Sequence, residues 1–400
     1  MSADFDVVVA GASLAGCAAA RLFAQAGAQV AVVERRPGID AHKVACTHQI
    51  QSSAVPAIER LGLAPLLAEA GAVRPMAVPW TPFGGWIRVP RAPRGYGITR
   101  RRLDPMVRRL AADTPGVTLM LGWSAVGLLQ DGDRVGGVEI EAPDRERTRL
   151  RCRLTVAADG RETTLARLAG VRARVLPHHR FAYWAYWRGV GTPPDEARLW
   201  FLDPDAAAVF PNEEGTLIAF VAHNRRLGEF RGDPESAYEA AIRGLPDGPG
   251  LDGAERVSDV MGKLSMPNKM RPAAVPGLAF AGDAAIAADP LFGVGCGWAF
   301  QTAEWLAETT RDALMDRGDL DAALGRYRRA ILRRLGPHHI QMSDYSTGRP
   351  ISASERLMFR AAARDPVVGG AFEAFATRRS LLAPFDPRLG PRILRAALDG

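Results

Sequence analysis

The stretch FDVVVAGASLAGCAAARLFAQAGAQVAVVE, residues 5–34, decides the fold of this chain. An apolar run at 5–10 leads into a turn that contains glycine, an alanine-rich segment at 14–27 and a second apolar run at 29–33. Parallel strands that are buried on both faces are continuous apolar runs, so the pattern predicts a strand–helix–strand unit. The fold class is therefore predicted to be α/β, with a doubly wound, Rossmann-type domain that binds a dinucleotide.

The turn itself is GASLAG, and it departs from the usual dinucleotide fingerprint at one position. The fingerprint has glycine at its first, third and sixth positions, whereas the third position here is Ser13. Gly11 allows the tight turn, Gly16 allows close packing of helix on strand, and the N–H groups of the helix N-terminus favour a pyrophosphate. Glu34 follows the second strand, where an acid can accept a hydrogen bond from a ribose hydroxyl. The alternative is an ordinary turn with a solvated Glu34.

Composition favours a two-domain globular protein and argues against several kinds of partner. The 400 residues suit two coupled domains, and the net charge of +7 comes from scattered arginines, so we expect no nucleic-acid partner. We see no apolar run long enough for a transmembrane segment and no secretory signal pattern, so we expect a cytoplasmic location. No metal site is predicted, because no metal-ligand spacing relates the four cysteines, which are Cys17, Cys46, Cys152 and Cys296.

Two further segments place polar residues directly after apolar strands. In VAADGRETTLARLAG, residues 156–170, Asp159 follows a strand and either caps the next helix or accepts a hydrogen bond from a ligand. In GLAFAGDAAIAADPLFGVGCGWAF, residues 277–300, a strand ends at Gly282 and Asp283, and three glycines then precede a helix. Main-chain N–H groups in such a loop stabilise negative charge, although a flexible connector has the same composition.

The remainder of the chain predicts two more regions. Short alternating segments at 180–222 predict an antiparallel sheet that serves as a substrate domain inserted into the dinucleotide-binding domain. From about residue 298 onward we expect helices, broken at Pro337, Pro350, Pro366 and Pro384. The predicted ranges are 1–75, 99–175 and 260–335 for the dinucleotide-binding domain, 76–98 and 176–259 for the β-sheet domain, and 336–400 for a helical C-terminal region.

Aromatic residues alternate along FAYWAYWRGV, residues 181–190. A strand there places Tyr183 on one face and Trp184 and Tyr186 on the other, which favours sheet core over substrate wall without excluding the latter. The histidine pairs at 178–179 and 338–339 fall on predicted loops, and we expect them at the surface.

In this order, the glycine turn, the central Asp-Gly and the late Gly-Asp with its proline and glycines resemble the FAD-dependent aromatic hydroxylase superfamily. These are the group A flavin monooxygenases, typified by para-hydroxybenzoate hydroxylase, and the resemblance covers roughly residues 1–310. It implies a Rossmann-type FAD-binding domain, with NAD(P)H as a transient co-substrate. Geranylgeranyl reductase-like enzymes and flavin-dependent halogenases share the scaffold, so the resemblance specifies fold and cofactor better than reaction.

The resemblance also implies roles for individual residues. Those that would face the substrate are Tyr183, Phe210 and Phe292. It points to no general base, so the catalytic residues are left unassigned. Those that would hold FAD are Gly11, Ser13, Leu14, Ala15, Gly16, Glu34, Arg35, Lys43, Arg100, Val126, Asp159, Gly282, Asp283, Pro290, Gly293, Gly295, Cys296 and Gly297.

For the reaction, the resemblance implies a monooxygenase that hydroxylates or epoxidises an aromatic or polyene small molecule through a flavin C4a-hydroperoxide formed from O2, in secondary metabolism. The alternative is a reductase or dehydrogenase of the geranylgeranyl reductase type, favoured by the GCGWA end of the glycine loop, where hydroxylases more often have Gly-x-Asn. Halogenation is disfavoured, because the segment closest to the halogenase W-x-W-x-I-P pattern is GGWIRVP at 84–90. A non-catalytic flavin-binding protein is the remaining alternative, and the oligomeric state is left open.

Overall fold

The main sheet of the structure, a computed structural model that describes residues 3–398, is built on the strand–helix–strand unit at the N-terminus. Its strand order is β19-β20-β10-β1-β2-β7, and all neighbours are parallel except β19 and β20. Val7, Val8 and Val9 are fully buried, as expected for a parallel strand covered on both faces. The bounds are β1 Phe5–Ala10, β2 Val30–Glu34, β7 Val117–Leu121, β10 Arg147–Ala157, β19 Ala274–Val275 and β20 Leu278–Phe280.

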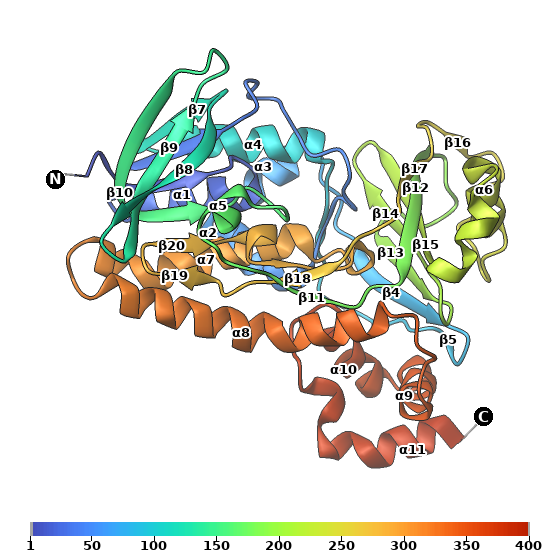
Figure 1. The fold of residues 1–400 in the computed structure, drawn as a ribbon. Coiled ribbons are helices and arrows are strands. Elements are labelled where there is room, and N and C mark those ends of the chain that lie inside the picture. Colours follow the sequence, from blue (N-terminus) through green and yellow to red (C-terminus); the bar gives the residue numbers. More distant parts are fainter. Residues whose placement is uncertain (1–2, 399–400) are drawn as a thin grey trace.

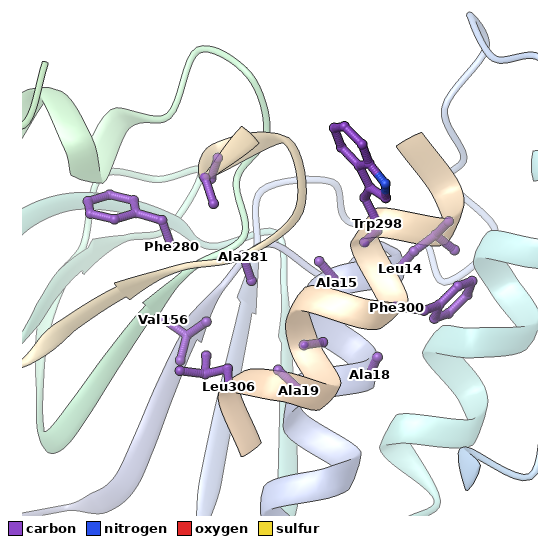
Figure 2. Close-up of a cluster of buried hydrophobic side chains, with 14 of the residues drawn as sticks. Leu14, Ala15, Ala18, Ala19, Val156, Phe280, Ala281, Trp298, Phe300 and Leu306 are labelled. Atoms are coloured by element: carbon purple, nitrogen blue, oxygen red, sulfur yellow. The ribbon is translucent and has the colours of Figure 1, made fainter. Parts of the chain in front are cut away.

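Helices that also pack on one another cover this sheet. Small side chains let the first helix, α1, approach α7 closely, and Figure 2 shows Ala15, Ala18 and Ala19 of α1 beside the helix that carries Trp298 and Phe300. The helix α4 packs on α1, and α8 packs on α7 and runs as a long rod toward the second sheet (Figure 1). The bounds are α1 Leu14–Gln25, α4 Arg100–Ala112, α7 Gly295–Leu314 and α8 Leu320–Tyr345.

The long strand β10 belongs to two kinds of ladder. Its second half pairs in parallel with β1 and β20, whereas its first half pairs antiparallel with β9, which pairs with β8. The short helix α5 packs on β8. The strand therefore carries the chain from an antiparallel layer into the helix-covered sheet. The bounds are β8 Ser124–Asp131, β9 Arg134–Glu141 and α5 Thr164–Leu168.

The second large sheet has the order β16-β12-β15-β14-β13-β4-β5, with β17 also paired to β12, and it is antiparallel except where β13 meets β4. Phe181 and Ala185 pack in a cluster with the helix α6, whereas Trp184 and Tyr186 pack on the core of the main unit. The predicted alternation along this strand is therefore confirmed. The bounds are β4 Met76–Thr81, β5 Gly85–Trp86, β12 Arg180–Arg188, β13 Glu196–Phe201, β14 Ala206–Asn212, β15 Gly215–His223, α6 Pro234–Arg243, β16 Glu255–Arg256 and β17 Met261–Lys263.

Short elements connect these units. The pair β3-β6 and the small sheet β11-β18-β21 belong to neither of the two large sheets. Their bounds, with those of the short helices, are β3 Gln49–Ile50, η1 Ser52–Ala54, α2 Val55–Arg60, α3 Ala64–Glu69, β6 Tyr96–Gly97, β11 Arg174–Leu176, η2 Asn224–Phe230, β18 Asn268–Met270, η3 Gly282–Ala284, β21 Ile286–Ala287 and η4 Pro290–Phe292.

The C-terminal helices form a separate small core. Val368 and Phe372 pack there with Ile87, which lies beside β5, so this group of helices is attached to the second sheet. Figure 1 shows the group at the end of α8, beyond the second sheet. None of the helices within residues 3–398 combines the length and hydropathy that crossing a bilayer requires. The bounds are α9 Ala353–Arg364, α10 Pro366–Ala376, η5 Ala383–Phe385, η6 Pro387–Leu389 and α11 Gly390–Leu398.

Several sequence-based expectations are wrong in detail. The helix α7 begins at Gly295, before the expected position near 298, and α8 continues through Pro337, where we expected a break. Proline lacks one backbone donor, but burial of the α8 face that carries Ile331 and Leu335 outweighs that loss. The strand β17 begins at Met261 within the range predicted for the first domain, yet it pairs with the second sheet. The other domain limits remain predictions.

The prediction that the two histidine pairs lie at the surface is also wrong, except for His179. His338 and His339 lie on the buried side of α8, and His339 is within hydrogen-bond distance of the Ala287 carbonyl, at 3.1 Å. The side chain of His178 is buried against Asp289, with 3.0 Å between Nε2 and Oδ2, whereas His179 is exposed as expected. The continuous helix is the reason, because it turns residues 338 and 339 inward.

The burial of His338 predicts a pH dependence of stability. Desolvation, with a contribution from Arg378, lowers the pKa of His338 to about 4, below the ordinary value of about 6.5. As the pH falls, the unfolded state therefore takes up the proton before the folded state does. The contribution of His338 to the free energy of unfolding is complete above about pH 6.5 and is lost as the pH falls toward about 4. We expect the melting temperature to drop less between about pH 7 and about pH 5 in His338→Gln than in the wild type. The matched control is His42→Gln in an exposed loop, and equal slopes for all three proteins would contradict the prediction.

Candidate functional site

The turn between β1 and α1 leaves no space for side chains at two positions. Gly11 has φ +107°, and a Cβ there would lie 2.5 Å from the Ala158 carbonyl oxygen. A Cβ at Gly16 would lie 1.8 Å from the Gly11 carbonyl oxygen. Both positions therefore require glycine, because the helix starts in direct contact with the strand and with the end of β10. The first turn of α1 contains no acidic residue and no capping side chain.

Ser13, the exceptional residue of the turn, has a partner that explains it. It occupies the N-cap position of α1, and its Oγ accepts a hydrogen bond of 2.7 Å from Nη2 of Arg100. The hydroxyl hydrogen of Ser13 is therefore left to donate elsewhere. Arg100 is 4% exposed, and its Nε donates to Oδ1 of Asp104 at 2.7 Å. The serine thus fixes a buried cation beside the N-terminus of the helix, where an anion is already favoured.

Two further residues of α4 hold this arrangement together, and sequence reasoning missed both. Arg108 is fully buried, and it donates to the Ala12 carbonyl at 3.0 Å and to the Ala41 carbonyl at 2.9 Å. Asp104 accepts from the main-chain N–H of Lys43 at 2.9 Å. Residues 100, 104 and 108 recur every four positions, which places them on one face of a helix, and this spacing was the available signal.

Glu34 lies at the end of β2 and points back to the turn. Its Oε2 accepts from the Ala12 N–H at 2.9 Å, and its Oε1 accepts from the Arg36 N–H at 3.0 Å. Arg35, the neighbouring predicted residue, is exposed. The carboxylate is therefore held in position at the turn by the backbone.

The later motifs converge on the same region. Asp159 accepts from the Thr164 N–H at 2.7 Å and so caps α5, one of the two roles that the sequence left open. Gly282 packs so closely on α1 that a Cβ there would lie 2.9 Å from the Cβ of Ala15. Asp283 forms an ion pair with Lys43, with 3.3 Å between Oδ2 and Nζ. Burial opposes the charge of Asp283, but Lys43 and other nearby cations lower the pKa of its carboxyl group.

The glycine loop closes the site from the side of α7. Pro290 begins η4, Gly293 ends it with φ +60°, and a Cβ at Gly295 would lie 3.9 Å from Oδ1 of Asp283. Gly297 faces η1, since a Cβ there would lie 3.1 Å from the Cβ of Ala54. The Sγ of Cys296 lies 3.6 Å from the Sγ of Cys46. Cys46 is a further residue that the predicted set of site residues omitted.

A cavity lies next to this loop, between η4 and the second sheet. Phe210 and Phe292, two of the predicted substrate residues, both line it. Thr377 from the C-terminal region completes the wall, so three parts of the chain meet there. The other lining residues are Gln49, Gln51, Ser52, Pro75, Ala77, Pro93, Gly95, Ala197 and Leu199.

Two predicted residues lie apart from this cavity and loop. Tyr183 stacks on Phe230, with 5.3 Å between the ring centroids, in the cluster on the far face of the second sheet, so it does not face the cavity. The alternation along β12 explains this, because it points Tyr183 to the opposite face from Tyr186. Val126 is half-buried at an irregularity between β8 and β9 and is not a lining residue of the cavity. Leu14 and Ala15 are buried, so only their main chain can face a ligand.

A buried histidine–tyrosine pair was missed by the sequence analysis. Nδ1 of His48 accepts from the Arg100 N–H at 2.9 Å, and Nε2 of His48 is hydrogen-bonded to the Tyr186 hydroxyl. Burial lowers the pKa of His48, so the ring is neutral at pH 7 and its proton sits on Nε2, opposite the Arg100 contact. Burial also raises the pKa of Tyr186, which keeps its phenol protonated.

These residues fit a flavin dinucleotide. The helix N-terminus has free capping capacity for a pyrophosphate, and Arg100 with Lys43 supplies positive charge beside it. Gly11 allows the tight turn, and Gly16 allows the close contact of helix and strand that a dinucleotide-binding turn requires. FAD would be held by this turn, by Glu34 and by the segments around 159, 283 and 293–297.

The lack of space for a side chain at Gly16 gives a direct test of the turn. In Gly16→Ala the added methyl overlaps the Gly11 carbonyl, so the turn must deform, and we expect the purified variant to lose its flavin. Ser13→Gly is the matched control, and we expect it to retain flavin, because the close backbone contacts at Gly11 and Gly16 are unchanged. The measurement is the ratio of flavin to protein absorbance, with circular dichroism to show that both variants are folded. Full occupancy in a folded Gly16→Ala protein would show that this turn is not at the pyrophosphate.

Comparisons with known proteins agree with this geometry. The menaquinone reductase of Mycobacterium tuberculosis is 30% identical over 79% of this chain and 77% of its own length. The digeranylgeranylglycerophospholipid reductase of Picrophilus torridus is 24% identical over 85% of this chain and 86% of its own. A geranylgeranyl bacteriochlorophyll reductase-like structure from Thermoplasma acidophilum, 20% identical, has a TM-score of 0.74 and covers 99% of this chain and 98% of its own.

The family assignment follows from a match over most of the sequence. The family model described as an FAD binding domain matches residues 4–324. The predicted superfamily, the α/β fold class and FAD as the cofactor are thereby confirmed, and NAD(P)H is the reductant typical of such proteins. The chain belongs to the FAD binding domain family and is an FAD-dependent oxidoreductase.

Proposed function

We propose that the protein is a reductase that passes electrons from NAD(P)H, through FAD, to an apolar polyene or aromatic molecule. The cavity beside the glycine loop carries this proposal, because Phe210, Phe292 and Leu199 give it apolar walls. It lies where a substrate would meet the segment 290–297, which closes the cofactor site. The likeness in sequence to two proteins named as reductases supports reduction as the reaction.

Reduction of a double bond adds two electrons and two protons to the substrate. Bound FAD supplies the two-electron redox chemistry. The chain's own residues position the substrate, exclude water from the cavity and supply protons. The Tyr186 hydroxyl, hydrogen-bonded to neutral His48, is the group we propose as the proton donor, because its phenol stays protonated. The phenolate that remains keeps the hydrogen bond from Nε2–H of His48 and regains its proton from water.

Oxygenation is the second candidate. The order of the glycine turn, the Asp159-Gly160 segment and the Gly282-Asp283 segment is shared with the aromatic hydroxylases, which favours hydroxylation or epoxidation of an aromatic or polyene substrate with O2. The same cavity would serve either reaction. The two candidates differ in their need for oxygen, and this difference decides between them.

The test compares turnover with and without oxygen. FAD-loaded protein is mixed with NADPH or NADH and with a panel of prenylated quinones, polyenes and phenols, under strict anaerobiosis and in air with isotope-labelled oxygen. We expect anaerobic product formation, with a mass gain of two hydrogens. Product formed only in air, with labelled oxygen in it, would replace the reductase by the monooxygenase. A purified protein that takes up no FAD would exclude both candidate reactions.

The proposed proton donor gives a mutational prediction. Tyr186→Phe removes the hydroxyl and keeps the ring packing, so we expect kcat to fall by about 100-fold with flavin content unchanged. Tyr183→Phe, three residues earlier on the opposite face of β12, is the control and should retain wild-type turnover. Steady-state kinetics on the substrate identified above measures both. A Tyr186→Phe enzyme with wild-type kcat would exclude the phenol as proton donor.

A further inference from the structure

Arg378 is a buried cation in an unusual backbone position. It follows α10 and has φ +65°, a conformation in which helices most often end with glycine. Its side chain is nevertheless packed inside the protein, since the residue is only 9% exposed. An arginine in this backbone position, with its side chain buried, indicates that the side chain has a role in the interior.

The hydrogen bonds of its guanidinium group use only one end. Nη1 donates to Oε1 of Gln341 at 3.2 Å and to the Phe375 carbonyl at 3.3 Å. Within residues 3–398, Nε has no hydrogen-bond partner, and both hydrogen bonds of the group are made by Nη1 rather than Nη2. The edge formed by Nε–H and Nη2–H is therefore open. That edge has the spacing of the two oxygens of one carboxylate.

No acidic side chain of the described residues neutralises this cation. The buried carboxylate of the same helix, Glu373, is bonded instead to Arg379. Burial lowers the pKa of Arg378 to about 9, so at pH 7 the group still carries its charge. A buried charge without a counter-charge is unfavourable, and a bound anion would correct the imbalance.

The guanidinium group lies next to two residues of the cavity wall. It sits 5.1 Å from the ring centroid of Phe292, which lines the cavity, and its neighbour Thr377 lines the cavity too. Two other lining residues carry buried polar atoms without partners in the described part of the chain, namely Oε1 of Gln49 and Oγ of Ser52. The Phe292 ring gives the guanidinium a cation–π partner, but it leaves these polar atoms and the open edge without hydrogen bonds.

We propose that Arg378 binds an anionic group, a carboxylate by its geometry, at one end of the substrate. The apolar part of that molecule lies against Phe292 and Phe210, and Gln49 with Ser52 binds a further polar group. The substrate class is then an apolar polyene or aromatic acid. This inference rests on the proposed function, because it takes the cavity as the substrate site. A phosphate monoester presents a similar pair of oxygens, so the experiment compares the two.

The experiment measures binding of matched pairs of probes to the FAD-loaded protein. The pairs are cinnamate with cinnamamide, 2-naphthoate with 2-naphthamide, geranate with geranamide, and geranyl phosphate with geraniol. Dissociation constants come from calorimetry and from the change in the flavin spectrum. The variants are Arg378→Gln, which removes the charge, Arg378→Lys, which keeps it, and Arg388→Gln, an exposed arginine of the same region, as the control.

We expect at least one anionic probe to bind the wild type at least about tenfold more tightly than its neutral partner. Arg378→Gln should abolish that preference without weakening the neutral probe, Arg378→Lys should keep part of it, and Arg388→Gln should leave it unchanged. A preference for geranyl phosphate alone would support the anion site and assign it to phosphate. Equal binding within every pair, or a preference that survives Arg378→Gln, would overturn the proposal.

The same preparations separate this inference from the proposed function. Flavin content and the rate of flavin reduction by NAD(P)H are measured for each variant before the probes are added. Intact flavin reduction with no anion preference would refute the role of Arg378 and leave the reductase proposal standing. Loss of flavin or of its reduction in the wild type would refute the proposed function itself.

Discussion

The buried guanidinium group of Arg100 joins the parts of the chain on which the cofactor site depends. It donates to Ser13 in the turn and to Asp104 on its own helix, and it lies 3.9 Å from the sulfur atoms of both Cys46 and Cys296. A charge with 4% exposure is stable only when it is paired, and Asp104 is the pair. Because the four contacts come from different segments, the turn, the loop at 35–48 and the start of α7 are held in one arrangement.

The second sheet adds one wall of the cavity through the alternation of its side chains. One face of β12 and β15 packs with α6 and η2, and the other face, including Tyr186, packs on the main unit. The same alternation in β14 turns Phe210 toward the glycine loop. The cavity thus lies between the glycine loop and the second sheet, and Thr377 of the C-terminal region closes it.

This scaffold does not by itself select a reaction. Solved structures with a similar fold include a flavin-dependent brominase and a geranylgeranyl bacteriochlorophyll reductase-like protein, at identities of 19% and 20%. The fold is common to them, so the chemistry of this chain must be argued from particular side chains. The distinctive groups are His48 with Tyr186 and the open edge of Arg378.

The sequence by itself determined the parts of this protein that are local. Residues 5–34 predicted the strand–helix–strand unit, since continuous apolar runs and glycines at 11 and 16 constrain the backbone over short distances, and the ordered motifs identified FAD. Only the tertiary structure decided which distant side chains meet. His48 and Arg378 gave no signal of their own, and the surface placement of His338 was wrong, because burial depends on helix α8 continuing through a proline. Contacts between residues that are hundreds of positions apart follow from the packing of whole elements, and no local pattern specifies them.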